Sequence, residues 1–222
     1  MTTIPPTTIR VIAPDGRLTP ARRRRMMLDL CLRRARPGTG SAPEFLHRRT
    51  AMHPWPDLRS TLRGIPWLIV GGVATRAYMP ERATQDMDIL IRVADSDLVW
   101  QKLHAAGYTR VSELAIPGFV ARSPEDVELD ILYSDEAWLD EALQHPETDA
   151  AGYPVIGLPY LVLMKLASAR AQDMADLARM LGLASEARLA QVRNAVRRYA
   201  LDAVEDLESL IYLGRLEIES DR

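Results

Sequence analysis

The 222-residue chain has one cysteine, two lysines and no long apolar run, and these shortages exclude several classes of protein and site. Cys31 alone forms no intrachain disulfide and supplies too few ligands for a cysteine zinc site. No apolar run approaches the roughly 20 residues that a membrane-spanning helix needs. The first residues, MTTIPPTTIRVIAPDG, lack the basic and then apolar pattern of a secretory signal. We therefore expect a cytoplasmic protein with no membrane partner.

Histidine is also scarce, and its distribution argues against two common kinds of hydrolytic site. The four histidines, His47, His53, His104 and His145, are scattered over about a hundred residues without helical or strand pairing for zinc. No strand–turn–helix elbow motif supports Ser-His-Asp chemistry. The hydrophobic content of 47% and the charged content of 26% are ordinary for a globular protein.

The net charge of −2 hides a strongly basic segment near the start of the chain. Residues 17 to 50 contain ten arginines and two acidic residues, a local charge of +8. Within them, residues 21 to 36 read as a basic helix from Ala21 to Ala35. This helix could bind the backbone of RNA, such as tRNA, or triphosphate oxygens. Alternatively, it lies on the acidic body of its own protein.

Hydrophobic patterning predicts an α+β protein with three segments. Residues 1 to 63 form an N-terminal extension that carries the basic helix, and residues 64 to 157 form a core in which strands and helices alternate. Residues 158 to 222 read as helix throughout, which predicts a C-terminal helical bundle. The length allows one large domain or two small ones.

The most informative stretch is PWLIVGGVATRAYMPERATQDMDILI, residues 66 to 91, which begins with a strand and a double glycine. The apolar run Trp67 to Val70 is short and ends at a breaker, which is typical of a buried strand. Gly71 and Gly72 allow a sharp turn and close approach of a ligand to the backbone N–H groups. A helix start at this point favours bound phosphate. The two glycines are therefore candidate nucleotide-binding residues.

The returning run begins with two aspartates that share one face. Side chains alternate along a strand, so Asp86 and Asp88 point one way while Met87 and Ile89 point the other. Two carboxylates about 7 Å apart on an apolar strand repel each other, which favours a cation between them. Oxygen ligands with a neighbouring phosphate site suit Mg²⁺ or Mn²⁺. The pair therefore predicts a metal site for phosphoryl or nucleotidyl transfer.

A third carboxylate is expected on a neighbouring strand, because metal sites of this kind share their ligands among several strands. The segment VELDIL places Glu128 and Asp130 on one face. We prefer Asp130, which has apolar residues on both sides, as a third metal ligand that helps to deprotonate the attacking hydroxyl. The alternative is that Asp130 ends a solvent-facing stripe.

The double glycine, the DMD pair and the later ELD together resemble the nucleotidyltransferase superfamily that includes DNA polymerase β. Within it, RATQDMDILI and LPYLVLMKLASARAQDMADLARML resemble the AbiEii-like branch of toxin–antitoxin and phage-abortive systems. The resemblance covers roughly residues 64 to 184. It implies a nucleotidyltransferase-like mixed β-sheet flanked by helices and a Mg²⁺-dependent transfer of a nucleoside monophosphate from a nucleoside triphosphate to a hydroxyl, with release of pyrophosphate.

The resemblance also extends the set of site residues to a second motif. Lys165 matches a lysine that would neutralise triphosphate charge in catalysis, and Arg170 matches the arginine after it. Asp173 is expected either to border the nucleotide cleft with them or only to cap a helix, with Asp176 as a first-turn acid.

Two further positions lie just before the metal pair. Arg82 and Thr84 either line the nucleotide pocket or are an ordinary loop arginine and strand-entry threonine. Where many relatives have serine, this chain has Gly72, so a phosphate contact there must come from backbone N–H.

The function expected from these motifs is a toxin–antitoxin component that nucleotidylates RNA, such as the tRNA 3′ end, and has a possible cognate antitoxin as partner. One alternative keeps the chemistry but transfers the nucleotide to a protein or to a small molecule such as an aminoglycoside. Another is a catalytically silent nucleotide-binding or protein-binding module. The three aligned carboxylates argue against silence.

Overall fold

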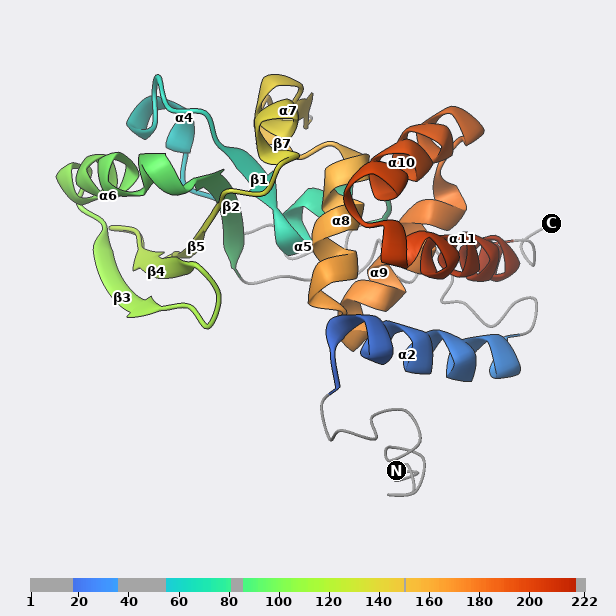
Figure 1. Ribbon diagram of the computed structural model, residues 1–222. Coiled ribbons are helices and arrows are strands. Elements are labelled where there is room, and N and C mark those ends of the chain that lie inside the picture. The colour runs from blue at the N-terminus through green and yellow to red at the C-terminus, as the bar shows by residue number, and fades with distance from the viewer. Residues whose placement is uncertain (1–17, 36–54, 81–85, 150, 219–222) are drawn as a thin grey trace. The chain divides into compact units, whose positions relative to one another are not determined.

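The computed structural model describes residues 18–35, 55–80, 86–149 and 151–218 (Figure 1). Contacts divide the chain into two compact units, one formed by Met1–Ser41 together with Val162–Arg222 and the other by Ala42–Leu161. The N-terminal helix therefore groups with the C-terminal helices. The domain boundaries 1–63, 64–157 and 158–222 stay a prediction. Among the described residues, no helix is long and apolar enough to cross a membrane.

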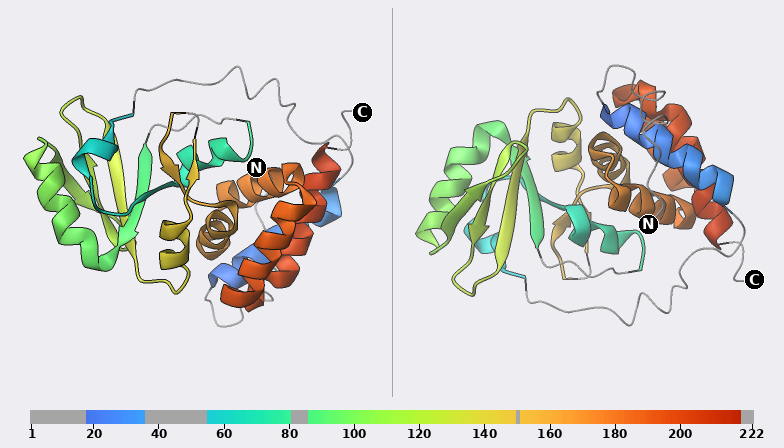
Figure 2. Two further views of the ribbon diagram at one scale, coloured as in Figure 1. Left: turned by 90° about the horizontal axis from the view of Figure 1, so that it is seen from above. Right: turned by 90° about the horizontal axis from the view of Figure 1, so that it is seen from below.

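The unit Ala42–Leu161 is built on a seven-stranded mixed sheet with the strand order β3-β4-β5-β2-β1-β7-β6 (Figures 1 and 2). The strands are β1 (Leu68–Val70), β2 (Met87–Arg92), β3 (Thr109–Glu113), β4 (Gly118–Arg122), β5 (Glu128–Ser134), β6 (Glu147–Thr148) and β7 (Pro154–Val155). β2 pairs with β1 antiparallel and with β5 parallel. β7 continues the sheet parallel to β1. The expected α+β class with a mixed sheet is confirmed.

Short helices flank this sheet. They are α4 (Leu58–Thr61), α5 (Gly71–Ala74), η1 (Thr75–Ala77), η2 (Val93–Asp95), α6 (Ser96–Ala105) and α7 (Leu139–Gln144). α6 packs along the β3–β4–β5 end, where Trp100 meets Phe119 edge to face with ring centroids 5.6 Å apart (Figure 1). Phe119, Leu129 and Ile131 are almost fully buried, so the apolar face of the sheet forms the core of this unit.

The other unit is helical, as expected for the C-terminal region. It contains α2 (Pro20–Arg34), most of α8 (Leu158–Ser168), α9 (Ala171–Leu183), α10 (Glu186–Tyr199), η3 (Leu201–Ala203) and α11 (Val204–Ile218). α2 begins as the sequence predicts, because Pro20 occupies its first turn and the Thr19 hydroxyl accepts a hydrogen bond from Arg22 N–H at 3.3 Å. α10 is capped in the same way by Ser185.

α9 and α11 approach each other at two glycines. A Cβ on Gly214 would lie 1.9 Å from the carbonyl oxygen of Ala178, and one on Gly182 would lie 2.5 Å from the backbone of Gly214. Only residues without a side chain fit at these two positions. The helical unit therefore owes its packing to backbone contact between α9 and α11 as well as to buried leucines such as Leu177 and Leu210.

Candidate active site

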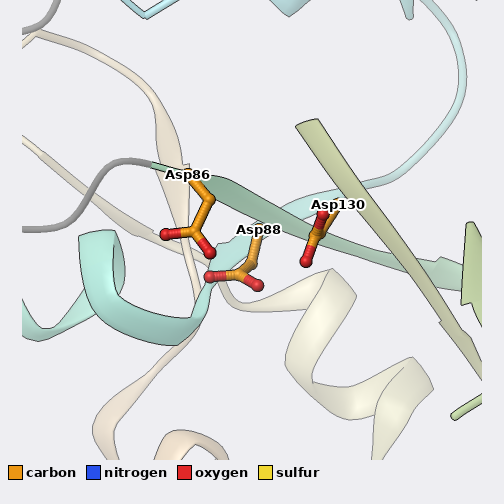
Figure 3. Close-up of side chains that lie close together, drawn as sticks. All are labelled: Asp86, Asp88 and Asp130. Atoms are coloured by element: carbon orange, nitrogen blue, oxygen red, sulfur yellow. The ribbon is translucent and has the colours of Figure 1, made fainter. Parts of the chain in front are cut away.

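The three predicted carboxylates come together at one end of β2 and β5. The parallel register places Asp88 directly beside Asp130, and Asp86 lies immediately before β2 (Figure 3). One carboxylate oxygen from each of Asp86, Asp88 and Asp130 lies within 4.8 Å of the other two. Asp86 is exposed, and the other two are half-buried. The side chains of this group face the same side in Figure 3.

Strand alternation explains why the carboxylates gather on one face. Met87 and Ile89 of β2 are fully buried, and so are Leu129 and Ile131 of β5. Because successive side chains point to opposite faces, the intervening Asp88 and the facing aspartate of β5 emerge together on the other face. The buried neighbours thus hold both strands in the register that aligns the acids.

The carboxylates repel one another, and this repulsion contributes to a raised pKa of Asp130. Burial raises the pKa of Asp130 above its ordinary value, and the negative charges of Asp86 and Glu128 raise it further. A cation bound among these oxygens would relieve the repulsion. The donor set of carboxylate oxygens, partly open to solvent, fits Mg²⁺ or Mn²⁺, which take one or two carboxylates together with water and phosphate oxygens.

The glycine turn follows β1 directly and lies against Asp88. Gly71 adopts φ +62° and begins the single-turn helix α5, and Val70 is the partner of Asp88 across β1 and β2. Gly72 is buried, and its carbonyl accepts a hydrogen bond from the Thr75 hydroxyl at 2.7 Å. The sharp turn is as the sequence indicates. The phosphate-binding role of Gly71 and Gly72 stays a prediction.

The second motif forms a buried ion-pair cluster in the helical unit. The Lys165 ammonium donates to Asp173 at 2.9 Å and to Asp176 at 2.8 Å, and all three side chains are at most 5% exposed. The Ser168 hydroxyl also donates to Asp173. These hydrogen bonds pair the buried charges of the cluster at the corner between α8 and α9. Ala169 forms this corner with φ +50°.

Arg170 completes this cluster from a more open position. Its side chain is 73% exposed, and its Nε donates to Asp173 at 2.8 Å. Burial alone would raise the pKa of Asp173, but hydrogen bonding from Arg170 and Ser168, together with the Lys165 charge, lowers it overall. Asp173 does not cap α9: the N-cap is Arg170, and Asp173 lies in the first turn. The nucleotide-binding roles of Lys165, Arg170 and Asp173 stay predictions, while Arg82 and Thr84 lie outside the described residues.

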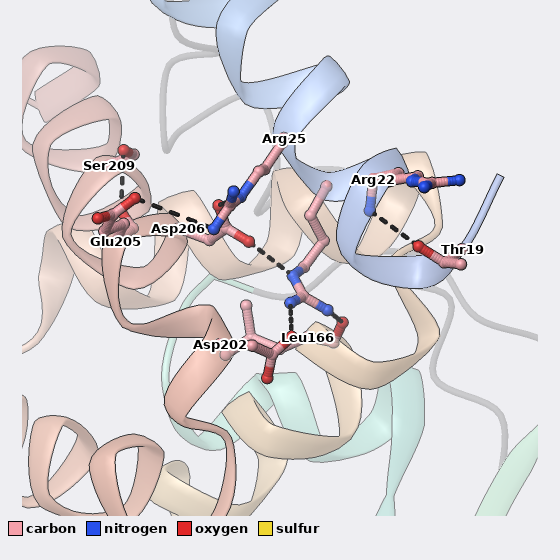
Figure 4. Close-up of polar contacts among 9 residues, drawn as sticks. Thr19, Arg22, Arg25, Leu166, Asp202, Glu205, Asp206 and Ser209 are labelled. Atoms are coloured by element: carbon pink, nitrogen blue, oxygen red, sulfur yellow. Dashed lines mark hydrogen bonds and ion pairs between the residues drawn. The ribbon is translucent and has the colours of Figure 1, made fainter. Parts of the chain in front are cut away.

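The basic segment has an arginine that sequence reasoning did not single out. Arg24 is 4% exposed and donates from Nε to Asp206 at 2.9 Å, from Nη2 to Asp202 at 3.1 Å and from Nη1 to the Leu166 carbonyl at 2.7 Å. Arg25 approaches Asp206 at 3.8 Å and Glu205 at 3.9 Å (Figure 4). For these two arginines, the helix lies on acidic residues of its own chain, as in the second interpretation of the sequence.

Comparisons with known proteins give loose structural likenesses. No protein-family model matches the chain, and a search of curated proteins finds no match. A crystal structure of ANT(2'')-Ia in complex with adenylyl-2''-tobramycin is 22% identical, covers 71% of this chain and 92% of its own, and has a TM-score of 0.40. The lincomycin-bound lincosamide antibiotic adenylyltransferase LnuA is 16% identical and has a TM-score of 0.35. The match covers 63% of this chain and 90% of the LnuA chain. Likenesses at this level assign no family, and the AbiEii-like branch stays a prediction.

Proposed function

We propose that the protein is a Mg²⁺-dependent nucleotidyltransferase that moves a nucleoside monophosphate from a nucleoside triphosphate to a hydroxyl acceptor. The observation that carries the proposal is the convergence of Asp86, Asp88 and Asp130 within 4.8 Å beside the Gly71 turn. Three carboxylates on one polar face of a buried sheet repel one another, and such an arrangement is useful where a cation and a polyphosphate bind. A purely structural role would need no such alignment.

The residues divide the work of the reaction among them. The acceptor oxygen forms a bond to the α-phosphorus, the bond from that phosphorus to the oxygen bridging to the β-phosphorus breaks, and pyrophosphate leaves. Asp130, which lies beside Asp88 on the neighbouring strand, receives the hydroxyl proton. Asp86 and Asp88 would hold Mg²⁺, which would acidify the hydroxyl and offset phosphate charge.

For the acceptor, we place a small hydroxylated molecule ahead of RNA. One reason to expect RNA, besides the motifs, was the positive charge of residues 21 to 36, and Arg24 and Arg25 of this segment pair with acidic side chains of the same unit. Arg24 is buried in its ion pairs and so cannot neutralise a phosphate backbone, whereas Arg25 is 62% exposed. A toxin–antitoxin role on tRNA and transfer to a protein side chain are the competing outcomes of the following test.

The test incubates the purified protein with each of the four α-labelled nucleoside triphosphates and Mg²⁺. Separate reactions contain total tRNA, a protein extract, or a small-molecule panel that includes tobramycin and lincomycin, the compounds in the structures compared above. We expect label on a small molecule and release of unlabelled pyrophosphate. Label on tRNA would replace this acceptor with RNA, and label on protein would replace it with a side-chain hydroxyl.

Two variants show whether the label is transferred by this protein or by a contaminating enzyme. Asp88→Asn keeps the size of the side chain but removes a ligand charge, so transfer should fall by at least about 100-fold. Asp135→Asn changes an exposed carboxylate just beyond the end of β5 and should leave transfer unchanged. Nucleotide binding without label transfer to any acceptor would overturn the enzyme proposal in favour of a silent binding module.

A further inference from the structure

Gly71 leaves space that the carboxylate of Asp88 occupies. A Cβ built on Gly71 would lie 1.9 Å from Asp88 Oδ2, 2.5 Å from its Cγ and 3.0 Å from its Cβ. These distances are far below normal van der Waals contact. The side chain of Asp88 therefore packs directly over the Cα of Gly71, in the place where any other residue would carry its own side chain.

The backbones on both sides of this contact have little freedom to separate. Val70, the residue before the glycine, is paired with Asp88 in the antiparallel ladder of β1 and β2. Met87 and Ile89, on either side of Asp88, are fully buried, and β2 is also bonded to β5 through six residue pairs. Because strand register is strongly specified in a buried sheet, the carboxylate is the part that would move.

We propose that Gly71 is a positioning residue for the cation site, and that its missing side chain seats the Asp88 carboxylate among the oxygens of Asp86 and Asp130. The proposal rests on the cation site of the proposed function but assigns to Gly71 a role other than phosphate contact. A side chain at position 71 displaces the Asp88 carboxylate and breaks up the three-oxygen group. Gly71 then governs cation affinity through Asp88 without touching the cation.

The chain offers a matched control for the backbone conformation. Gly71 has φ +62°, so alanine there is strained even without a steric clash. Gly64 has φ +84°, yet a Cβ on it meets nothing within 4 Å. Gly64→Ala thus reproduces the left-handed strain in the same unit, and Gly71→Ala adds the clash with Asp88. The difference between the two variants isolates the effect of the clash.

The first experiment measures binding of Mn²⁺ alone by electron paramagnetic resonance, without nucleotide. Loss of a group that orients a metal ligand typically weakens metal affinity about 10- to 100-fold, so we expect a loss of this size for Gly71→Ala. Gly64→Ala should bind Mn²⁺ with the affinity of the unaltered protein. Equal affinities for Gly71→Ala and Gly64→Ala would overturn the positioning role.

The second experiment measures the stability of the metal-free protein. It therefore gives a result even if Gly71→Ala folds poorly. In a double-mutant cycle, Asp88→Ala removes the two atoms nearest to the added Cβ and leaves only the 3.0 Å contact. We expect Gly71→Ala to lower the urea midpoint strongly in the unaltered protein, but only about as much as Gly64→Ala in the Asp88→Ala background. An equal drop in both backgrounds would show that the carboxylate does not occupy this space and would overturn the inference.

These readouts separate the inference from the proposed function. Weakened Mn²⁺ binding in Gly71→Ala, together with failure of nucleotidyl transfer in the unaltered protein, would support the positioning role and refute the activity. Transfer that continues at the normal rate and Mg²⁺ dependence in Gly71→Ala would refute the positioning role alone. Absence of Mn²⁺ binding in the unaltered protein would overturn both.

Discussion

Replacing Asp130 with asparagine should stabilise the Ala42–Leu161 unit at neutral pH, although the change removes a predicted metal ligand. Asp130 is half-buried, and one of its oxygens belongs to the group within 4.8 Å of Asp86 and Asp88. Asparagine keeps the shape of the side chain and removes its charge. A site arranged to bind a cation should therefore carry a stability cost when the cation is absent, and this substitution measures that cost.

The separation of the carboxylates sets the size of the effect. For two unit charges 4.8 Å apart, Coulomb's law gives about 0.9 kcal/mol in bulk water and about 3.5 kcal/mol at an effective dielectric constant of about 20. Asp86 is exposed and Asp130 is half-buried, so water and salt screen much of the repulsion. We therefore expect Asp130→Asn to raise the free energy of unfolding by about 1 to 2 kcal/mol at pH 7 without divalent cations.

The pH dependence has a defined sign. The pKa of Asp130 is raised in the folded state above the ordinary aspartate value of 3.8, so the folded protein holds this proton more tightly than the unfolded chain. As pH rises through the window between the two values, the unfolded chain loses its proton first and stability falls. Near pH 4 the unfolded chain is about half protonated at this position, so the penalty is smaller there, and it disappears at lower pH. The advantage of Asp130→Asn should therefore be present at pH 7 and lost in acid.

Urea unfolding in EDTA, followed by circular dichroism at pH 7 and near pH 4, measures this difference. Asp135→Asn, the control for loss of one exposed charge, should shift the midpoint little at either pH. Adding Mg²⁺ should raise the midpoint of the unaltered protein more than that of Asp130→Asn. The reasoning is refuted if Asp130→Asn is less stable than the unaltered protein at pH 7. It is also refuted if the gain in the free energy of unfolding is the same at both pH values.

Four further substitutions test the helical unit, each by urea unfolding. Gly214→Ala should destabilise by about 1 to 3 kcal/mol or more, because the added Cβ meets backbone atoms of α9 and no side chain can rotate away; an unchanged midpoint would contradict this packing. Lys165→Met should cost about 3 to 5 kcal/mol, since it removes the ammonium that both buried aspartates share, and a cost below about 1 kcal/mol would contradict the buried ion pairs. Arg24→Met should destabilise at both low and high salt, whereas Arg25→Met, whose side chain is 62% exposed, should cost at most about 1 kcal/mol; equal effects would refute the distinction.

The face that carries the three carboxylates was predictable from the sequence because it depends on local periodicity. Alternation fixes which residues of β2 share a face, so the amino-acid order alone pairs Asp86 with Asp88. The same rule placed Glu128 and Asp130 on one face of their strand, and the apolar residues on both sides of Asp130 favoured it over Glu128. The parallel pairing of β2 with β5, which sets Asp88 beside Asp130, joins segments about forty residues apart, and no local pattern encodes it.

The contacts that sequence reasoning missed are those between distant or irregular segments. Lys165 finds Asp173 and Asp176 across a helix corner at Ala169, a non-glycine residue with positive φ that propensity does not anticipate. The packing of Asp88 over Gly71 depends on the exact geometry of a turn. Arg24 looked like one basic residue among many, and only the folded chain distinguishes it by burial.

The separation of Arg24 from Asp206 along the chain has a consequence during synthesis. The two residues are 182 positions apart, so the bond between them cannot form until Asp206, synthesised much later than Arg24, has left the ribosome. At typical elongation rates of about 5 to 20 residues per second, α2 waits roughly 10 to 40 seconds for its acidic partners. The sheet of Ala42–Leu161 is synthesised within that interval. Nascent chains stalled before Asp202 would thus carry Arg24 without the two aspartates that neutralise it, and they should adsorb to ribosomal RNA more strongly than the finished protein.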